Sequence, residues 1–450
     1  MQTRRQALGS IAASPLALGA MTSRAHAAPP GSSSAVAQAV AIAQMLVAPS
    51  GSPDDVARDE DFWTRVQQAF TIDRTHINLN NGGVSPSPAI VQEAMKRHLD
   101  FANTTPPPIS LWRIQEPFKE AVRQRLARHW GVDTEEIAIT RNSSESLQIC
   151  QQGFDLKRGD EVLTTTMDYP RMVTTFKQRM RREGLIYNQF KIPIPAEDDE
   201  TIVKLYEKNI TPRTRLILMS HIINITGQIM PVKKVVAMAR SKGIPVIVDG
   251  AHALAQFAFK ISDLDCDYYG VSLHKWLTAP HGTGLLYVRR DKIKSLWPLM
   301  ASEEKQDDDI RKFEEIGTHP LANFLAIAEA LTFHQSIGDA NKEARLRYLR
   351  EYWANRLLKY NERVRLHTSL KPQFSCCIAT VQVDGMDMID LARWLEEERG
   401  ILTTRIKHPE FDGLRITPNV YTTLEELDRF CEAMEWVITN GVPEPEEEEE

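Results

Sequence analysis

The chain has 450 residues, of which 42% are hydrophobic and 25% charged, and its formal net charge is −6. This length allows two or three domains with a sizeable core, and the acidic balance argues against nucleic acid as a general partner, since phosphate binding needs a surplus of basic side chains on one face. No apolar run reaches the ~18 residues of a membrane-spanning helix. Five scattered cysteines show neither metal-type spacing nor an even disulfide framework, so we expect them to be mostly free and buried: Cys150, Cys266, Cys376, Cys377 and Cys431.

The N-terminus predicts an export signal over residues 1–27. Arg4 and Arg5 precede a mildly apolar stretch, and Ala25-His26-Ala27 is an A-x-A cleavage pattern. The paired arginines resemble the signal of the twin-arginine export route, although Ala7 stands where that signal usually has Phe. We therefore expect cleavage near Ala27 and a periplasmic location. The alternatives are an ordinary secretory signal or a disordered basic start. If the signal is not used, the chain would be a cytoplasmic amino-acid lyase or epimerase.

The two ends of the mature chain predict little regular structure. Residues 29–53 are rich in Ala, Ser, Gly and Pro, which favours a linker or a loosely held arm, and we assign residues 28–74 to this linker and arm. Residues 443–450 read PEPEEEEE, which is typical of a solvated acidic tail.

The middle of the chain alternates short apolar runs with helical stretches. Six runs predict strands, because they are rich in β-branched or aromatic residues and bounded by turn signals: Ile137 to Thr140, Glu161 to Thr165, Leu216 to Ser220, Val246 to Asp249, Tyr268 to Ser272 and Gly284 to Val288. Predicted helices separate most of them: Ser144 to Gln152, Pro170 to Glu183 and Val232 to Ser241. Several strands lack polar alternation and must be covered on both faces. This predicts an α/β fold with a mostly parallel, doubly wound sheet.

From about Ser336 the pattern changes to long helices around a few strands. The predicted helices are Lys342 to Asn361, Met388 to Arg399 and Leu424 to Thr439, and one predicted strand is Cys376 to Val383. We therefore expect a large domain over residues 75–335 and a smaller α+β C-terminal domain over residues 336–442.

Polar residues follow the predicted strands, where open parallel sheets bind ligands. Ser143 and Ser144 open a helix, which indicates either a plain N-cap or a phosphate site on helix N–H groups. Neither GxGxxG nor a P-loop is present. Asp249 ends a buried strand, where a carboxylate needs a partner or a capping role. Lys275 follows another buried strand, which indicates a salt bridge with Asp249, a side chain that reaches the surface, or an amine whose pKa burial lowers.

Together these residues supply the groups that a binding site for pyridoxal phosphate requires. A phosphate anchor, a carboxylate for the pyridine nitrogen, a Schiff-base lysine and an aromatic platform at Tyr169 would all stand at one sheet edge. A zinc site through His252, His274 and His281 is disfavoured, because no acid or thiolate completes the ligand set. We treat His221 and His319 as structural.

The chain resembles the fold type I pyridoxal-phosphate enzymes of aminotransferase class V from about Asn78 to Tyr421. The ordered motifs that carry the resemblance are RNSSE, DY, SHIINITG, VDGAHA, SLHK, GTHP and LRITPNVY. The resemblance implies Lys275 as the Schiff-base lysine, Asp249 as the partner of the pyridine nitrogen and Tyr169 as the stacking residue. It also implies a phosphate-binding set and a ring-hydroxyl pair: Ser143, Ser144, Ser272 and His274 for the phosphate, and Asn224 and His252 for the hydroxyl.

The resemblance further implies a homodimer and a substrate side of the site. Thr318 in GTHP is similar to a threonine that reaches the phosphate across a dimer interface. Arg415 resembles the arginine that clamps the α-carboxylate of a small-molecule or peptide substrate, and Asn81 and Gly82 resemble the turn beside the bound amino acid.

Departures from the family pattern reduce the number of reactions that the chain is expected to catalyse. Residues 400–415 lack the nucleophilic cysteine that desulfurases carry on this loop, so desulfuration is not expected. Transamination, epimerisation and cleavage chemistry remain, and all begin with an external aldimine. NNGGVSPSP and LRITPNVYTT look most like the isopenicillin N epimerase-like branch, and with the signal the chain also resembles exported pyoverdine-tailoring enzymes, which act on a siderophore side chain. The alternative class is a protein of this fold that binds its ligand without turnover.

Overall fold

The computed structural model describes residues 34–443. The predicted export signal lies outside these residues, and so does the acidic tail after residue 443. The described residues from Ala39 onward form one compact unit. Within the described range, no helix has both the length and the apolarity that crossing a membrane requires.

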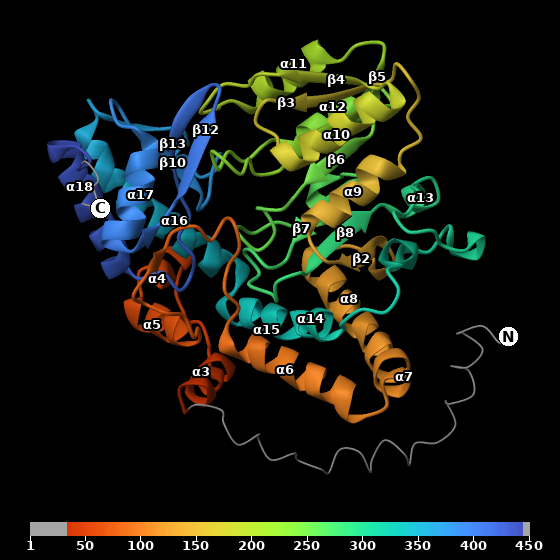
Figure 1. Ribbon diagram of the computed structural model, residues 1–450, viewed down its shortest axis with the longest axis horizontal. Helices are drawn as coiled ribbons and strands as arrows, with labels where there is room; N and C mark the ends of the chain where they lie inside the picture. The colour runs from red at the N-terminus through yellow and green to blue at the C-terminus, as the bar shows by residue number, and fades with distance from the viewer. Residues whose placement is uncertain (1–33, 444–450) are drawn as a thin grey trace, which may run out of the picture. The chain divides into compact units, whose positions relative to one another are not determined.

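A seven-stranded sheet forms the centre of this unit (Figure 1). Its strands are β2 (Ile137–Thr140), β3 (Glu161–Thr165), β4 (Ile186–Phe190), β5 (Thr214–Ser220), β6 (Val246–Asp249), β7 (Tyr268–Ser272) and β8 (Gly284–Val288). The spatial order is β2-β8-β7-β6-β5-β3-β4, and only β8 pairs antiparallel with its neighbours. The mostly parallel sheet predicted from the sequence is confirmed, and β4 is a strand that the sequence interpretation missed.

Both faces of the sheet are covered, because alternate residues of each strand enter different hydrophobic cores. Ile217 and Met219 of β5 belong to one core, and Leu216 and Leu218 to the other. Helices α9 (Ser143–Gly153) and α10 (Pro170–Glu183) contribute to the second core, whereas α8 (Glu116–Trp130), α12 (Val232–Ser241) and α15 (Ile327–Ile337) contribute to the first. The doubly wound arrangement is therefore confirmed.

The remaining helices connect the strands or lie beside the sheet (Figure 1). They are α6 (Ala89–Thr104), α7 (Pro107–Ile109), the π-helix η1 (Ser110–Gln115), α11 (Asp199–Asn209), α13 (Arg290–Ile293) and α14 (Ala322–Leu325). Four short 3₁₀ turns complete this region: η2 (Thr134–Glu136), η3 (Ile261–Leu264), η4 (Glu304–Gln306) and η5 (Ile310–Glu314).

The C-terminal part, residues 336–442, has its own antiparallel sheet and its own core. The sheet order is β12 (Thr404–His408), β13 (Phe411–Ile416), β10 (Ala379–Val383) and β9 (Val364–Leu366). Its helices are α16 (Asp339–Leu357), η6 (Leu358–Tyr360), α17 (Met388–Arg399) and α18 (Leu424–Asn440). The predicted strand over 376–383 begins three residues late, at Ala379. The predicted boundary between residues 335 and 336 stays a prediction, because all of these residues lie in one compact unit.

The N-terminal arm is more ordered than the sequence indicates. Helix α3 (Ser34–Gln44) falls within the expected linker, and α4 (Pro53–Ala57) and α5 (Glu60–Gln68) follow it. The Trp63 ring is fully buried, its indole N–H donates to the Val56 carbonyl at 2.7 Å, and the Arg345 guanidinium stacks over the ring and pairs with Glu60. Residues 53–68, which follow the stretch predicted to be loose, are thus packed on α16.

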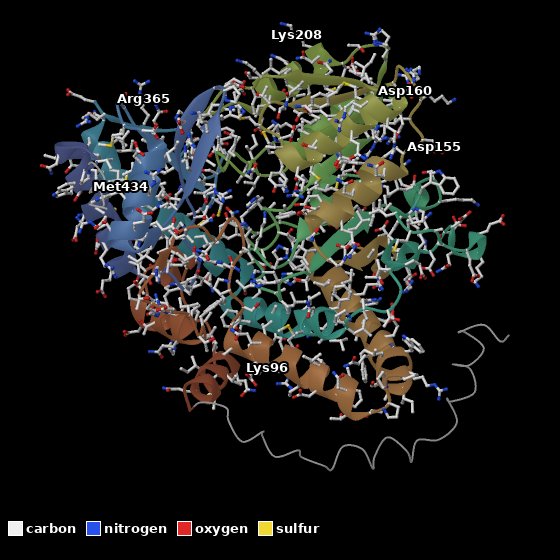
Figure 2. All side chains as sticks on the ribbon, in the orientation of Figure 1. Lys96, Asp155, Asp160, Lys208, Arg365 and Met434 are labelled. Atoms are coloured by element: carbon white, nitrogen blue, oxygen red, sulfur yellow. The ribbon has the colours of Figure 1, made fainter. Side chains whose placement is uncertain are left out.

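The side chains divide into core and surface as the hydropathy pattern requires. Figure 2 labels Lys96, Asp155, Lys208 and Arg365, which are exposed, and Met434, which is fully buried in the C-terminal part.

A short segment joins the C-terminal part to the region before α6. Strand β1 (Ile77–Asn78) pairs with β11 (Ile401–Leu402), and Asn80 bridges to Thr417. The predicted substrate-side turn at residues 78–88 therefore lies against strand β13, which carries Arg415.

Candidate active site

Four loops meet at the carboxyl edge of the parallel strands. Asp168, after β3, accepts bonds from the Ser220 N–H at 2.8 Å and the Ser220 hydroxyl at 2.9 Å, which ties the ends of β3 and β5 together. The His221 N–H donates to the Asp249 carbonyl at 2.8 Å, and the Gly250 N–H donates to the Gly270 carbonyl at 2.8 Å. The ends of β5, β6 and β7 are therefore in register, and the residues that follow them share one edge.

Lys275 contacts a histidine and not a carboxylate. Its Nζ lies 3.0 Å from His252 Nε2, and no carboxylate oxygen of the described residues lies within 4.0 Å of it. The alternative of a Lys275–Asp249 salt bridge is therefore wrong. Burial lowers the pKa of Lys275 to about 8, with the Asp249 charge opposing this shift and Arg415 adding to it.

His252 is a buried neutral imidazole. Burial, and then the charges of Lys275 and Arg415, hold its pKa well below the ordinary value. Since the Lys275 ammonium donates to Nε2, the ring proton is placed on Nδ1, and this nitrogen is buried without a partner. The site thus contains one unused N–H donor.

Asp249 is a buried carboxylate with a single hydrogen bond at its Oδ1, from the Ala251 N–H at 3.0 Å. Burial raises its pKa to about 6, although the Ala251 bond and Lys275 favour the ionised form. A carboxylate in this state has strong affinity for a further protonated nitrogen.

The lowered pKa of Lys275 predicts a particular pH dependence for its reactivity. Only the neutral amine is nucleophilic, so the rate at which the cofactor-free protein reacts with an aldehyde should rise about tenfold per pH unit below pH 8 and level off above it. A stopped-flow titration between pH 6 and 10 measures this rate. A rate that keeps rising to pH 10 would mean that the reacting lysine is an ordinary exposed one.

The start of α9 forms the expected phosphate side of the site. Asn142 is the N-cap, since its side chain accepts from the Glu145 N–H at 2.9 Å. The Ser143 N–H donates to Ser272 Oγ at 3.0 Å, and Ser272 Oγ donates to Ser143 Oγ at 2.8 Å. Ser144 beside them is partly buried. An N-cap and a phosphate site are compatible here, because Asn142 supplies the cap and the serines are left for the phosphate.

His274 completes this side as a second neutral imidazole. Its Nδ1 lies 3.1 Å from the Thr283 carbonyl, so Nδ1 carries a proton. Nε2 can donate to a phosphate only in the imidazolium form, which a bound dianion would favour. Burial lowers the pKa of His274 to about 4. Gly284 is needed nearby, because a Cβ at this position would lie 2.6 Å from the Asn142 Cα.

Arg415 provides a buried guanidinium with no acidic partner. Its Nη1 donates to the Asn224 carbonyl at 3.0 Å and its Nη2 to Asn80 Oδ1 at 2.9 Å, whereas its Nε is buried and unpaired. Within the described chain no carboxylate lies within 4.0 Å of this group. Burial lowers the pKa of Arg415 to about 10, so it stays charged at neutral pH. An unpaired buried cation is costly, and a bound carboxylate would satisfy it.

The asparagine beside this guanidinium is Asn80, whereas the sequence interpretation placed Asn81 near the bound amino acid. Asn81 is fully buried, and its amide donates to the carbonyls of Asn78 and Thr417 at 2.9 Å while its Oδ1 accepts from Tyr421. No capacity is left for a substrate. Gly82 does lie at the site, because a Cβ there would be 3.3 Å from the Arg415 Cζ.

Two predicted residues lie at the surface of the single chain. Tyr169 caps α10 without a side-chain bond and is 39% exposed, so its ring has a face free for stacking. Thr318 is exposed in the loop between η5 and α14. Its predicted role across a dimer interface stays a prediction.

The other histidines have separate partners. His221 is buried among aromatic rings, with Nδ1 2.9 Å from the Tyr269 hydroxyl, and His281 Nε2 lies 3.1 Å from the Ser85 carbonyl. His319 Nδ1 lies 2.8 Å from the Gly317 carbonyl. His252, His274 and His281 therefore have different partners, and none of the three is bonded to another.

A separate cluster places His129 and His334 on Asp339. Nε2 of His129 lies 3.1 Å and Nε2 of His334 2.6 Å from Asp339 Oδ1. The other carboxylate oxygen lies 3.8 Å from Lys260 Nζ, and Arg125 and Arg128 line the adjacent pocket. This positive surrounding disfavours a cation, and the cluster joins α8 to the corner between α15 and α16.

The residues of the predicted site fit pyridoxal phosphate. Among the predicted site residues, three buried polar atoms have no partner in the described part of the chain, namely Asn224 Oδ1, His252 Nδ1 and Arg415 Nε. Each such atom costs about 1–3 kcal/mol unless it is satisfied. The Asn224 amide and the His252 N–H suit a ring hydroxyl, the Arg415 N–H suits a carboxylate, and the paired serines suit a phosphate.

Comparisons with known proteins agree with this geometry. The family model of aminotransferase class V matches residues 77–430. Isopenicillin N epimerase of Streptomyces clavuligerus is 29% identical over 390 residues, which cover 83% of this chain and 98% of that protein. A probable cysteine desulfurase of Vibrio cholerae is 27% identical over 70% of this chain and 81% of that protein.

The fold agrees as well. The structure of a cysteine desulfurase from Thermococcus onnurineus NA1 superposes with a TM-score of 0.74 at 22% identity, covering 88% of this chain and 100% of that one. The structure of the cystine C–S lyase C-DES gives a TM-score of 0.70 at 24% identity, over 80% and 97% of the two chains. The chain therefore belongs to aminotransferase class V, one of the families of fold type I enzymes that depend on pyridoxal phosphate.

Proposed function

We propose that this enzyme acts at Cα of an amino-acid group, where it either inverts the configuration by epimerase-like chemistry or transfers the amino group. We also propose that it works as an exported homodimer. One observation supports this most strongly. The Lys275 amine and the Arg415 guanidinium are both enclosed at one edge of the sheet, and neither is paired with a carboxylate. The Lys275 amine, in its neutral form, is thus free for a cofactor aldehyde, and the Arg415 cation is free for a substrate carboxylate.

The side chains divide the work of binding between two ends of the site. Bound pyridoxal phosphate supplies an aldehyde that takes up the substrate amine and a ring that withdraws electrons from Cα. Ser143, Ser144, Ser272 and His274 would hold its phosphate, Asp249 its ring nitrogen, and Asn224 with His252 its hydroxyl. Arg415, with Asn80 and Gly82 beside it, would hold the substrate carboxylate and orient Cα.

Lys275 is the group that moves a proton. With a pKa near 8 its amine is neutral in about a tenth of molecules at pH 7, and this neutral form can take a proton from Cα and return it. His252 Nε2, 3.0 Å from Nζ, can accept a hydrogen bond from the protonated amine and keep it oriented. Because the site edge is buried, bulk water does not compete for this proton.

Desulfuration does not fit the positions of the thiols. All five cysteines are buried, and burial raises the pKa of Cys266 and Cys431 to about 12 and that of Cys376 to about 11. A thiolate nucleophile needs the opposite conditions, exposure and a lowered pKa. The hairpin of β12 and β13 that leads to Arg415 instead carries Glu410, which accepts from the Thr166 hydroxyl at 2.6 Å.

The similarity to isopenicillin N epimerase, which spans 98% of that protein, supports the proposal of epimerisation over transamination. The test incubates cofactor-loaded enzyme with amino acids and short peptides that have a free α-amino and α-carboxylate pair, in D₂O. Epimerase-like chemistry should place deuterium at Cα and invert the centre without loss of the amino group. Keto-acid formation with stoichiometric conversion of the cofactor to its amine form would instead establish transamination.

Arg415 should control substrate affinity more than cofactor binding. In Arg415→Lys the bidentate contact to a carboxylate is lost, so we expect KM to rise about a hundredfold while the visible absorbance of the bound cofactor is kept. Steady-state kinetics and cofactor titration measure the two effects. An unchanged KM would place the substrate carboxylate elsewhere.

Export to the periplasm rests on the sequence of residues 1–27. The paired Arg4 and Arg5 and the pattern at residues 25–27 support it, and a siderophore or other peptide side chain would be a suitable extracytoplasmic substrate. A mature N-terminus at Ala28 in the periplasmic fraction, lost in Arg4→Lys/Arg5→Lys, is the expected result. An uncleaved cytoplasmic protein from both the wild type and this variant would reject export. Profiling of periplasmic peptides and siderophores before and after deletion would identify the substrate.

The homodimer is supported by the position of Thr318. Its side chain is exposed in a single chain, as expected of a residue that completes the site of a partner. Light scattering should give twice the mass of the 51.0 kDa chain, less any removed signal. A monomer with full activity would contradict this arrangement.

A further inference from the structure

The loop that carries Asn224 is attached to the C-terminal part along its whole length. Residues 221–230 follow β5 and form a small hairpin, in which Ile222 bridges to Ile229 and the Ile223 N–H donates to the Gln228 carbonyl at 2.9 Å. The Ile229 N–H donates to the Phe374 carbonyl at 2.7 Å, and Gln228 bridges to Ser375. This hairpin thus belongs to the large sheet by sequence but rests on residues 368–380.

Three consecutive carbonyls of the hairpin accept bonds from three side chains of the C-terminal part. The Asn224 carbonyl accepts from Arg415 Nη1 at 3.0 Å, the Ile225 carbonyl from Thr380 Oγ1 at 2.6 Å, and the Thr226 carbonyl from Thr368 Oγ1. Thr380 pairs with Arg415 across the β10–β13 ladder. The donors therefore come from one small surface of the C-terminal sheet.

The two threonines are linked to each other and have no other visible task. Both are buried, with exposures of 3% for Thr368 and 0% for Thr380. The Thr380 N–H donates to Thr368 Oγ1 at 3.0 Å, so this hydroxyl both accepts and donates. Neither hydroxyl reaches the residues expected to touch cofactor or substrate, except through the backbone of the hairpin.

The hairpin cannot move away from its support without loss of close packing. Gly227 has φ +74°, and a Cβ at this position would lie 2.0 Å from the Ile378 carbonyl oxygen. The backbone at residue 227 therefore touches the backbone at residue 378. Glycine is needed here because of both the positive φ and the lack of space for a Cβ. By contrast, the side-chain Oδ1 of Asn224, three residues earlier in the same hairpin, is buried and unpaired. Because an amide oxygen only accepts, the atom of this side chain that can donate to a ring oxygen is Nδ2.

We propose that Thr368 and Thr380 are positioning residues that aim the Asn224 amide at the ring hydroxyl of the cofactor. They act by holding the carbonyls of the two residues that follow Asn224, in parallel with Arg415, which holds the carbonyl of Asn224 itself. This inference rests on the proposed role of Asn224 within the proposed function. If this inference holds, the C-terminal part helps to position a cofactor-binding residue, in addition to supplying Arg415 for the substrate.

The test compares Thr380→Val, Thr368→Val and the double variant with wild type and with Thr380→Ser, all loaded with cofactor. Valine keeps the shape and removes the hydroxyl, and serine restores it. Thr214→Val is the matched control, because Thr214 is equally buried and its hydroxyl donates to Glu161 at 2.6 Å, but at the opposite end of β5. Thr214 therefore loses a buried hydrogen bond without contact to the hairpin.

The first readout is the pH midpoint of the visible absorbance of the bound cofactor. A donor on the ring oxygen lowers the proton affinity of the nitrogen of Lys275 bonded to the cofactor, so a misplaced Asn224 should raise this midpoint, by about 0.5 to 1 pH unit in the double variant. Thr380→Ser and Thr214→Val should keep the wild-type midpoint. The second readout needs no cofactor: amide hydrogen exchange of residues 222–230 in the cofactor-free protein should accelerate about tenfold in the double variant.

The outcomes separate the inference from the proposed function. Wild-type protein that never develops visible absorbance with pyridoxal phosphate would sink both. Normal wild-type absorbance, with a midpoint in the double variant equal to that of wild type, would overturn the inference alone and make the threonines merely structural. If the double variant does not fold, the same measurements are made on the single variants, since each removes one of the two hydroxyl contacts.

Discussion

Replacing Lys275 with alanine is expected to abolish the visible absorbance of cofactor-loaded protein and to lower kcat by at least about a thousandfold. Lys275 is the only described residue whose amine combines a place after β7, a lowered pKa and contact with His252. Without it the protein has no group that can both hold the cofactor covalently and carry the Cα proton. Absorbance spectra and single-turnover rates on the preferred amino-acid substrate measure the two losses.

The control for this prediction separates the effect of the positive charge at residue 275 from that of its reactive amine. Lys275→Arg keeps a cation next to His252 but provides no amine that can become neutral near pH 8. It should be as inactive as Lys275→Ala, while added methylamine should partly restore turnover in the alanine variant. More than a tenth of the wild-type activity in either variant without added amine would show that another group performs the chemistry.

Replacing Glu314 with glutamine is expected to cost about 3 kcal/mol of unfolding free energy. Glu314 is buried between Arg123 at 2.5 Å and Lys119 at 2.8 Å, and its Oε1 also accepts from the Ile139 N–H of β2. A neutral amide would leave two cations buried and undercompensated. The midpoint of urea unfolding, with the slope m unchanged, measures this loss.

The pH dependence of this contribution has a defined sign. Burial opposes ionisation of Glu314, but Arg123 and Lys119 outweigh it and lower its pKa to about 2. A carboxyl whose folded pKa is depressed stabilises the fold above its unfolded pKa, near 4.5, and this contribution is lost as the pH falls toward 2. The difference between wild type and Glu314→Gln should therefore be largest at neutral pH and shrink below about pH 4.

An exposed ion pair provides the matched control for Glu314. Glu93 contacts Lys96 at 2.7 Å on the surface of α6, where Figure 2 labels Lys96. Glu93→Gln should cost less than about 0.5 kcal/mol, because solvent screens exposed pairs. Equal losses in the two variants would mean that the Glu314 cluster contributes no more than surface charge does.

The sequence predicts the centre of the molecule well, because local pattern and burial agree there. Runs such as Val246 to Asp249 and Tyr268 to Ser272 are apolar, short and bounded by turns, so both the strands and the polar residues that end them can be read directly. Asp249 and Lys275 are identified for the same reason. Each is a charged residue at a place where burial makes charge expensive.

Residues that depend on tertiary contacts are harder to predict. Asn80 and Asn81 are adjacent and identical in type, and only the bridge of Asn80 to Thr417 decides which amide faces Arg415. Asp168 stands beside Tyr169 in the same motif, but its bond to Ser220 spans 52 residues. The packing of Trp63 is not predictable from the sequence, because its contact with Arg345 of α16 is one that no local pattern reveals.

The most direct test of the central claim is to locate the covalent link between cofactor and protein. Cofactor-loaded enzyme is treated with borohydride, digested, and the modified peptide sequenced by mass spectrometry. We predict a single pyridoxyl phosphate group on Lys275. Modification of another buried lysine, such as Lys342, whose pKa burial lowers to about 7, or no modification at all, would contradict the assignment of Lys275 as the residue that binds the cofactor.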